Sequence, residues 1–367
     1  TPRARRRRSL PPLGPLALAM SASRGAPPRA RAIPTEILMR ILIHGAESDQ
    51  QMGARFLALN SSLRAALAPV VYARIELYTA TAIARFAELV RTRPEAARAV
   101  RRLWIGPHSA RSDLLTILSL PSVRDSPYLA EVREQTYVDT RIILRACRRL
   151  YDVALSGSLV ASDVVQSYGT ACQPRHVTSI NAHSFISAFD APMFRRVESL
   201  TVCDLNLSQS EAEAIRRMPA LRTFHYTTPK DYGDSVRDVH VLRKVLTDDA
   251  DLPLEDAIAR MRLNTAPLAH LIVRATAERA EDIARALYDC TDSATRHAHI
   301  STESLPISFV HEWDALRDLL FHAQDEYARM AVDDDTGTDV DPGQPLVHLL
   351  HEWRARCSAD ITHAPSA

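Results

Sequence analysis

Apolar and polar positions along the chain follow two periods, one typical of helices and one typical of short strands. Near the start, Ile37, Leu38, Ile41 and Leu42 fall at helical spacing on one face. Pro34 suits the first position of this helix, where its missing N–H has no intrahelical partner in any case. The pattern therefore predicts a short, strongly apolar helix at the front of the folded protein.

Further helical runs follow this first one. Gly45 is expected to end the first helix, because glycine readily adopts the left-handed backbone of a helix C-cap. Residues 51–59 predict a second helix, and a third begins after Asn60 and closes at Pro69. Residues 81–91 form another amphipathic run, so the N-terminal part is predicted to be helical.

Beyond residue 100, short apolar runs share the spacing apolar-x-x-apolar-x-apolar, which is the strand signature of a leucine-rich repeat. The hexamers that fit it best are 100–105, 150–155, 197–202 and 268–273. Their starts differ by 50, 47 and 71 residues, close to two, two and three units of about 24 residues. Weaker strands at 177–182 and 218–221 fill part of the gaps.

Helical runs lie between these predicted strands, at 128–150, 208–217 and 277–288. The alternation predicts an α/β (α+β) fold, arranged as an irregular leucine-rich-repeat-like solenoid. A less regular α/β layer is the competing architecture. C-terminal helices are predicted at 310–331 and 346–356, separated by an acidic, solvated loop at 333–343.

Composition narrows the classes of function. Apolar residues make up 46% of the 367 positions and the net charge is +1, so no whole-protein field attracts nucleic acid or membrane. No stretch approaches the ~20 apolar residues of a membrane helix. The chain has only 10 Gly and carries neither a G-x-G-x-x-G nor a Walker pattern. The five cysteines are scattered, which argues against a disulfide framework or a zinc site and favours a reducing compartment.

The first 32 residues stand apart, with eight Arg, six Pro and no acidic residue. We interpret 1–31 as a disordered basic tail. The run from Arg5 to Arg8 also matches a nuclear-localisation or nucleic-acid patch. A mitochondrial transit peptide is the third interpretation, although the prolines would break the helix that it needs. The first methionine is Met20, and translation from there would omit the arginine cluster.

The start of the folded part resembles a known family. Ile33-Pro34-x-Glu36-Ile37-Leu38-x-x-Ile41 is similar to the opening "L-P-x-E-[IL]-[LI]-x-x-I" of the F-box. Pro69-x-x-Tyr72-x-x-Ile75-x-Leu77, followed by Phe86, Pro94 and Val100-x-x-Leu103, looks like the region after the F-box in many fungal F-box proteins. The resemblance covers about residues 32–106. It departs from the family at Ile33, where the opening Leu is usual, and at Leu63-Arg64, where a Trp-Arg pair is usual.

This resemblance implies a docking module and a target-binding body. F-box helices bind a Skp-type adaptor subunit, which links them to a cullin ubiquitin ligase. The implied divisions are a tail (1–31), a three-helix F-box-like unit (32–77), a repeat-like α/β body (78–331) and an acidic loop with a last helix (332–367). The side chains expected to contact the adaptor are Ile33, Pro34, Ile37, Leu38, Ile41 and Leu42.

On this hypothesis the protein recruits a protein target for ubiquitylation in the cytosol or nucleus, with no catalytic residue or cofactor of its own. Neither membrane nor nucleic acid is an expected partner, and the target is not specified by the sequence. The alternative is a solenoid binding scaffold without a ubiquitin role. A hydrolase with an unrecognised site is a third, weaker hypothesis.

Several residue patterns were weighed as enzyme sites. His311-Glu312 and His351-Glu352 begin two "HEW" segments, but the position four residues after each His, where a zinc protease needs a second His, holds Ala. Trp313 and Trp353 are expected to pack in the interior. The acidic loop lacks a calcium-binding Glu at its twelfth position, which is Gln344.

Histidines and paired arginines remain as weaker candidates. The histidines that could combine with a Ser or Cys are His176, His183, His225, His297 and His299, although no G-x-S-x-G elbow positions a nucleophile. Three basic pairs each sit beside a predicted strand, Arg101-Arg102, Arg148-Arg149 and Arg195-Arg196. They either line one surface that binds an acidic partner or are ordinary solvated residues at strand ends.

Overall fold

The computed structural model describes most of the chain between residues 34 and 359. The described residues are 34–107 without 49 and 60, then 114, 117, 118, 126–181, 185–230, 235–246, 268–290, 298–313 without 308 and 312, and 344–359. The chain divides into two compact units, Thr1–Ile41 and Leu42–Ala367. Within the first unit the described residues are 34–41, which include the first half of helix α1.

Three helices precede the sheet: α1 (Thr35–Ser48), α2 (Gln50–Phe56) and α3 (Ser61–Val71). Their existence was predicted, but two of their ends were not. Pro69 lies in the last turn of α3 and the helix ends at Val71, so Pro69 does not close it. A proline there removes one backbone N–H from the ladder, which a final turn tolerates better than a helix centre.

The prediction that Gly45 ends the first helix was also wrong, because Gly45 lies inside α1. A Cβ atom added at this glycine would lie 3.2 Å from Met52 Sδ and 3.3 Å from Phe56 Cε2. Contacts that short require the neighbouring side chains to move. Gly45 therefore lies where the side chains of α2 approach α1 closely, and it does not act as a helix C-cap.

The body of the protein is a mixed α/β structure built on an eight-stranded parallel sheet. The strands lie side by side in the order of the sequence. They are β1 (Arg74–Leu77), β2 (Arg102–Ile105), β3 (Asp152–Ser156), β4 (His176–Asn181), β5 (Ser199–Asp204), β6 (Thr223–Thr227), β7 (His270–Ala275) and β8 (His299–Ser304).

The apolar spacing located most of these strands. Each of the four hexamers overlaps one of them (β2, β3, β5 and β7), and the weaker run at 177–182 overlaps β4. The strand predicted at 218–221 was misplaced, because β6 begins at Thr223. The same apolar spacing starts three residues later, at Leu221-x-x-Phe224-x-Tyr226, and this run overlaps β6. The first and last strands, β1 and β8, were not predicted as strands.

Equivalent residues line up across the whole sheet. One buried row joins Ile75, Leu103, Val153, Val177, Leu200, Phe224, Leu271 and Ile300. One position before each strand, a backbone carbonyl accepts two N–H groups of the next strand, as the Arg101 oxygen does from Tyr151 and Asp152. The same pattern repeats at Ala73, Tyr151, Arg175, Glu198 and Arg222, whereas the Ala269 oxygen accepts only the His299 N–H. Neighbouring strands from β1 to β7 are therefore entered in the same way.

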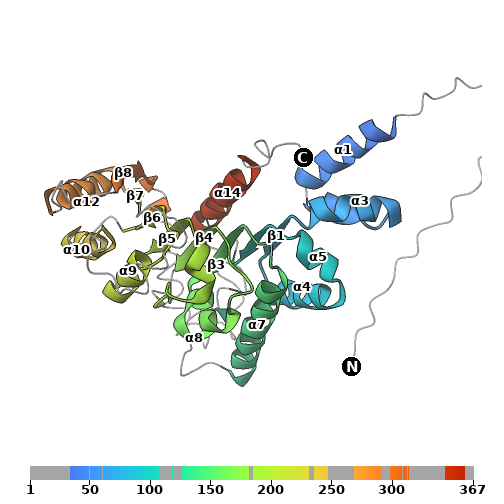
Figure 1. Ribbon diagram of the computed structural model, residues 1–367, viewed down its shortest axis with the longest axis horizontal. Helices are drawn as coiled ribbons and strands as arrows, with labels where there is room; N and C mark the ends of the chain where they lie inside the picture. The colour runs from blue at the N-terminus through green and yellow to red at the C-terminus, as the bar shows by residue number, and fades with distance from the viewer. Residues whose placement is uncertain are drawn as a thin grey trace, which may run out of the picture. The chain divides into compact units, whose positions relative to one another are not determined.

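Helices cover one face of the sheet and form the main core with it (Figure 1). The larger ones are α4 (Ala80–Thr92), α7 (Pro127–Ala146), α9 (Gln209–Arg216), α10 (Ser235–Leu246) and α12 (Ala277–Cys290). Shorter helices are α5 (Pro94–Ala99), α8 (Ser162–Val165) and the 3-10 turns η1 (Gly157–Val160), η2 (Gln166–Tyr168) and η3 (Pro192–Arg196).

Side-chain caps fix where three of these helices begin. The Thr79 hydroxyl accepts the Ala82 N–H at α4, and the Ser126 hydroxyl accepts the Leu129 N–H at α7. At α9, Ser208 and Glu211 form a reciprocal capping box. Such caps satisfy the backbone N–H groups that the first helical turn leaves free.

The opposite face of the sheet carries the C-terminal helix, α14 (Gln344–Ala359) (Figure 1). A second, smaller apolar cluster lies between them. Its aromatic residues include Trp104 from β2, Trp353 from α14 and Trp313, which are the chain's three tryptophans and are almost completely buried. The prediction that Trp313 and Trp353 pack in the interior is confirmed. The rest of the predicted helix at 310–331, and the acidic loop at 333–343, lie outside the described residues.

Candidate functional site

The first half of α1 exposes the apolar face that the sequence assigned to a partner. Ile37, Leu38 and Ile41 keep 51%, 42% and 57% of their surface exposed. Pro34 is also exposed, and its carbonyl accepts the N–H groups of Ile37 (3.0 Å) and Leu38 (3.1 Å), which starts the helix. Leu42 is half-buried, and Ile33 lies outside the described residues. Three large apolar side chains on one turn of a helix are the kind of feature that marks a protein contact.

The residues at the usual Trp-Arg position of the family lie on α3. Leu63 is half-buried and Arg64 is exposed. The Arg64 Nε donates a 2.9 Å hydrogen bond to the Leu57 carbonyl, which follows α2. Arg64 therefore connects α3 to the preceding turn.

The second candidate site is the sheet face that α14 covers, which we call the α14 face. At its centre, Asp152 on β3 accepts bonds from Arg356 Nε (2.9 Å) and Nη2 (3.2 Å) and from Trp353 Nε1 (3.0 Å). The carboxylate is 2% exposed and the Arg356 side chain 35%. The same guanidinium donates to the Thr178 hydroxyl on β4 at 3.0 Å. One buried carboxylate thus holds two side chains of α14.

A second carboxylate holds the neighbouring turn of α14. Glu76 on β1 accepts from Arg354 Nε at 2.9 Å and also from its Nη2, while the Tyr78 hydroxyl bonds both Glu76 and Arg354. Burial opposes the ionisation of Glu76, but the hydrogen bonds from Arg354 and Tyr78 and the nearby guanidinium charges outweigh it and hold its pKa below the usual value. Glu76 is therefore a carboxylate at neutral pH. Burial and the neighbouring Glu76 carboxylate raise the pKa of Tyr78, which keeps its phenol protonated.

Near β1 and β3 the sheet supplies the carboxylates and α14 supplies the arginines, but at β7 the sheet supplies the arginine and α14 the carboxylate. There Arg274 on β7 donates to both oxygens of Glu352 on α14, at 3.0 and 2.5 Å. Arg274 Nε also lies 2.9 Å from a carboxylate oxygen of Glu303 on β8. The α14 face therefore offers acidic groups toward β1 and β3 and a basic group toward β7.

The contacts of α14 reach strands on both sides of the sheet. Glu352 and Arg354, two residues apart on α14, contact β7 and β1. Residues two apart project about 200° apart around a helix. These two ion pairs therefore hold α14 to the sheet from opposite sides.

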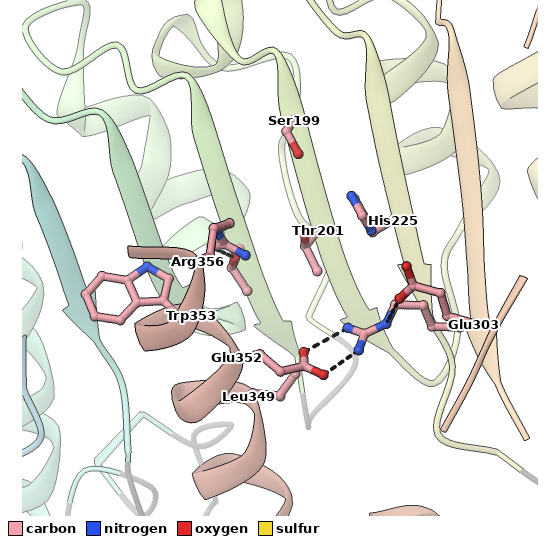
Figure 2. A pocket seen from close by; sticks show the side chains of 10 residues that line it. Ser199, Thr201, His225, Glu303, Leu349, Glu352, Trp353 and Arg356 are labelled. Atoms are coloured by element: carbon pink, nitrogen blue, oxygen red, sulfur yellow. Dashed lines mark hydrogen bonds and ion pairs between the residues drawn. The ribbon is translucent and has the colours of Figure 1, made fainter. Parts of the chain in front are cut away.

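A pocket of about 290 Å³ remains between α14 and the sheet (Figure 2). It is lined by Thr178, Ser199, Thr201, His225, Arg274, Glu303, Leu349, Glu352, Trp353 and Arg356. Burial, together with the charges of Arg274 and Arg356, lowers the pKa of His225 to about 4, so its imidazole is neutral at physiological pH. Figure 2 shows Thr201 and His225 on adjacent strands. Arg274 pairs with both Glu303 and Glu352.

Both guanidinium groups of this pocket have carboxylate partners. Arg274 pairs with Glu303 and Glu352, and Arg356 pairs with Asp152, so this set of groups does not favour an anion. The groups available are two hydroxyls, of Ser199 and Thr201, and the neutral imidazole. Ser199 and His225 both line the pocket. Among the described residues, no hydrogen bond joins His225 to either hydroxyl or to a carboxylate, so the hydrogen-bonded chain of a catalytic triad is not formed by them.

The other histidines and both HEW segments occupy separate places. His176 Nε2 lies 3.0 Å from the Tyr151 hydroxyl, and the rings of His270 and His299 are 6.0 Å apart. His183 and His297 lie outside the described residues. His351 is exposed, and the neighbouring Glu352 forms an ion pair with Arg274. In the part of the chain that the structure describes, no group of three or more His, Cys, Asp or Glu side chains is arranged to hold a metal ion.

The three arginine pairs lie near the starts of β2, β3 and β5, as the sequence predicted. The two members of the first pair make different contacts. Arg102 turns to the α14 face and donates to the Cys357 carbonyl. Arg101 donates to the Arg98 carbonyl at 2.8 Å. The pairs before β3 and β5 are exposed at their strand starts.

A polar cluster at the ends of β4 and β5 was not foreseen from the sequence. Asp204 accepts the Asn206 N–H at 2.9 Å and the Asn181 Nδ2 at 2.6 Å, and Asn206 in turn accepts from Lys230 at 2.5 Å. Burial raises the pKa of Asp204 to about 7, with Glu211 adding to the rise and the bonds from Asn206 and Asn181 opposing it. An Asn and an Asp at the ends of neighbouring predicted strands were the available signal.

Four cysteines belong to the interior. Cys147, Cys172, Cys203 and Cys357 are buried and free. Burial raises the pKa of the Cys147, Cys172 and Cys357 thiols to about 12 and that of Cys203 further, so all four are protonated at neutral pH.

The chain matches no protein-family model, no curated protein and no solved structure. Within the described residues, no helix combines the length and apolar character that crossing a bilayer requires. The two candidate surfaces are the exposed turn of α1 and the α14 face.

Proposed function

We propose that the protein is an F-box substrate-recognition adaptor of a Skp–cullin–F-box ubiquitin ligase. The observation that carries the proposal is the exposure of Ile37, Leu38 and Ile41 on α1. These positions are the ones that match the F-box opening, and a buried apolar face would have removed the docking surface. A Skp-type subunit that covers them would remove apolar area from water, which is favourable at about 25 cal/mol per Å².

The body supports the second half of this proposal. Its parallel strands follow one another in sequence, and equivalent residues are spaced by 24, 23 and 24 residues from Asp152 through His176 and Ser199 to Thr223. These intervals fall within the 20–29 residues of a leucine-rich repeat. In our proposal the body is an irregular solenoid of this kind, it holds a protein target, and the transfer chemistry belongs to other subunits in the cytosol or nucleus.

The test is co-purification with a purified Skp-type adaptor subunit. The double variant Ile37→Asp and Leu38→Asp is expected to lose the complex, because two carboxylates would be buried without partners at the contact. The matched control is Ile186→Asp with Val236→Asp, which also places two carboxylates at exposed apolar positions, 64% and 65% exposed. This control is expected to bind like the unmodified protein.

Circular dichroism checks that each variant folds before binding is compared. If the unmodified chain forms no complex with the adaptor subunit, the ubiquitin-ligase role fails. The alternative, a binding scaffold of the same fold without a ubiquitin role, would then take its place. If both double variants lose binding equally, the contact does not lie on α1.

A further inference from the structure

We infer that the edge of the sheet where strands β2 to β6 begin binds an extended acidic segment of a partner protein. This surface, which we call the arginine edge, consists of the segments that lead into these five adjacent strands, at 98–101, 147–151, 173–175, 195–198 and 216–222. It uses no contact of α1, so the inference goes beyond the proposed docking role. In the proposed adaptor, the acidic segment belongs to the target.

The first support is a concentration of positive charge that the whole chain does not have. The segments of the arginine edge contain ten arginines and one acidic residue, Glu198, whereas the net charge of the chain is +1. The remainder of the chain is therefore net acidic. A basic surface on such a chain attracts an anion locally, without a positive field over the whole protein.

The second support is that the topology places the segments in one row. The carbonyl of Arg101 accepts the Tyr151 N–H, and the Tyr151 carbonyl accepts the Arg175 N–H. The next two contacts of the same kind join Arg175 to Glu198 and Glu198 to Arg222. With strands about 4.8 Å apart, the row from Arg101 to Arg222 is roughly 19 Å long. About six residues of an extended polypeptide, at about 3.3 Å each, span this length.

The third support is the availability of the guanidinium groups. Five of the arginines are exposed, namely Arg148, Arg149, Arg195, Arg196 and Arg222. Among the described residues, no carboxylate forms an ion pair with any of these five. Burial and the charge of Arg149 lower the pKa of Arg101, so like charges lie close together on this edge. A bound carboxylate would reduce the repulsion between them.

Ordinary helix ends and one ion pair account for part of the charge. The Arg217 Nε donates to the Glu213 carbonyl at 3.3 Å, which is a usual contact of a basic residue at a helix C-terminus. Arg175 pairs with Glu198 at 3.4 Å, but its side chain remains 59% exposed. These contacts leave the five exposed arginines for a ligand.

The chemistry of the arginine edge favours an acidic polypeptide over a nucleic acid. Guanidinium groups bind carboxylates through two parallel N–H···O bonds. Proteins that bind single-stranded nucleic acid also use aromatic rings as stacking platforms. The aromatic residue of the row is Tyr151, and its ring already packs against two groups: the Arg175 guanidinium lies 6.0 Å from its centroid, and the His176 ring centroid lies 4.8 Å away.

The experiment measures binding of a fluorescein-labelled deca-glutamate peptide to the full chain by fluorescence anisotropy at low ionic strength. We expect saturable binding that weakens with added salt. The triple variant Arg148→Glu, Arg195→Glu and Arg222→Glu reverses one charge before each of β3, β5 and β6. It is expected to raise the Kd by about tenfold or more, because three exposed ion pairs of up to about 1 kcal/mol each are lost.

A matched triple variant separates the arginine edge from net charge. Arg55→Glu, Arg85→Glu and Arg237→Glu make the same change of charge at exposed positions on α2, α4 and α10, outside the edge. This control should bind the peptide with a Kd within about twofold of that of the unmodified protein. Circular dichroism reports folding, and the corresponding Arg→Gln variants replace a triple variant that does not fold.

Three outcomes would overturn the inference. The unmodified protein could fail to bind the peptide, or both triple variants could lose binding equally, which would make the effect one of net charge. A labelled oligothymidine could bind more tightly than the peptide and be lost in the edge variant, which would identify a nucleic-acid surface instead. No adaptor subunit is present in this assay, and α1 is unchanged in every variant, so its failure leaves the proposed docking role of α1 untouched.

Discussion

Arg356 and Asp152 form a two-bond ion pair although they lie 204 residues apart in the chain. The pair joins the last helix to the third strand, and Trp353 donates to the same carboxylate. Removing the buried Asp152 carboxylate would leave a half-buried guanidinium without its ion-pair partner and a buried indole N–H without its acceptor.

Replacing Asp152 tests this arrangement. We expect Asp152→Asn to lower the free energy of unfolding by about 2–4 kcal/mol, since it breaks a buried ion pair on one side only. The matched control is Asp282→Asn, which removes an exposed carboxylate from its pair with Arg285 and should cost under ~1 kcal/mol. Urea unfolding followed by tryptophan emission measures both. Equal effects of the two variants would show that the Asp152 pair contributes no more than a surface pair.

The sequence predicted the strand and the helix of this interface, but it did not predict that they are in contact. Apolar spacing located β3 and the last helix, because spacing reports which side chains face a core. It carries no information about which of two buried faces a distant helix covers. Arg354 and Glu76 meet across 278 residues, and neither lies in a motif. The side chains on α1 were the opposite case, since a local motif named Ile37, Leu38 and Ile41, and their exposure is a local property.

Some errors of prediction had local causes. Gly45 has the sequence character of a helix stop, but the close approach of Met52 and Phe56 decided its place inside α1. The sixth strand was misplaced because Met218 and Leu221 are both apolar, so the strand pattern could be started at Met218, three residues before Leu221.

The pKa of His225 should report whether α14 is in place. With α14 bound, burial and the charges of Arg274 and Arg356 hold this pKa near 4. A depressed histidine pKa contributes stability that is present above pH ~6.5 and is lost as the pH falls toward 4. In the variant Arg354→Glu and Arg356→Glu, we expect the His225 pKa to rise toward ~6.5, the value of a solvated imidazole. NMR titration of the ring resonances measures it, and a pKa that stays near 4 in a variant with released α14 would contradict the assignment.

Asp204 should make the protein less stable as the pH rises. Its pKa in the folded protein is about 7, whereas an unfolded aspartate titrates near 4, so the folded state holds this proton more tightly. The associated stability is fully present below pH ~4 and is lost as the pH rises to about 7, by a total on the order of 3–4 kcal/mol. The variant Asp204→Asn lacks this pH-dependent loss, because an amide does not titrate. Its NH2 group cannot accept the bond that Asn181 Nδ2 donates to Asp204, so the variant also carries a cost that does not change with pH.

The comparison of the two proteins isolates this single group. From pH 5 to pH 8 the stability of the unmodified protein should fall relative to that of the variant, by about 2–3 kcal/mol. Other titrating groups affect both proteins alike, so the difference between them is the quantity to plot against pH. A difference that does not change between pH 5 and pH 8 would mean that Asp204 is ionised across this range.

Gly157 should tolerate no side chain, because Asn181 lies against it. A Cβ atom at Gly157 would lie 2.4 Å from Asn181 Oδ1 and 3.0 Å from its Cα atom. Asn181 cannot move aside, since its amide bonds the Phe185 N–H at 2.9 Å, the Phe185 carbonyl at 2.7 Å and Asp204 at 2.6 Å. We expect Gly157→Ala to lower the free energy of unfolding by about 2–3 kcal/mol, as overpacking of a rigid site does.

The neighbouring residue supplies the control for this prediction. Ser158 is equally buried, and its hydroxyl has no hydrogen-bond partner among the described residues. Ser158→Ala should therefore change stability by less than ~1 kcal/mol, because it removes an unsatisfied polar atom and no contact that the fold requires. Urea unfolding compares the two alanine variants directly. If Gly157→Ala were as stable as Ser158→Ala, the close approach of β4 to the 3-10 turn η1 would not be a requirement of the fold.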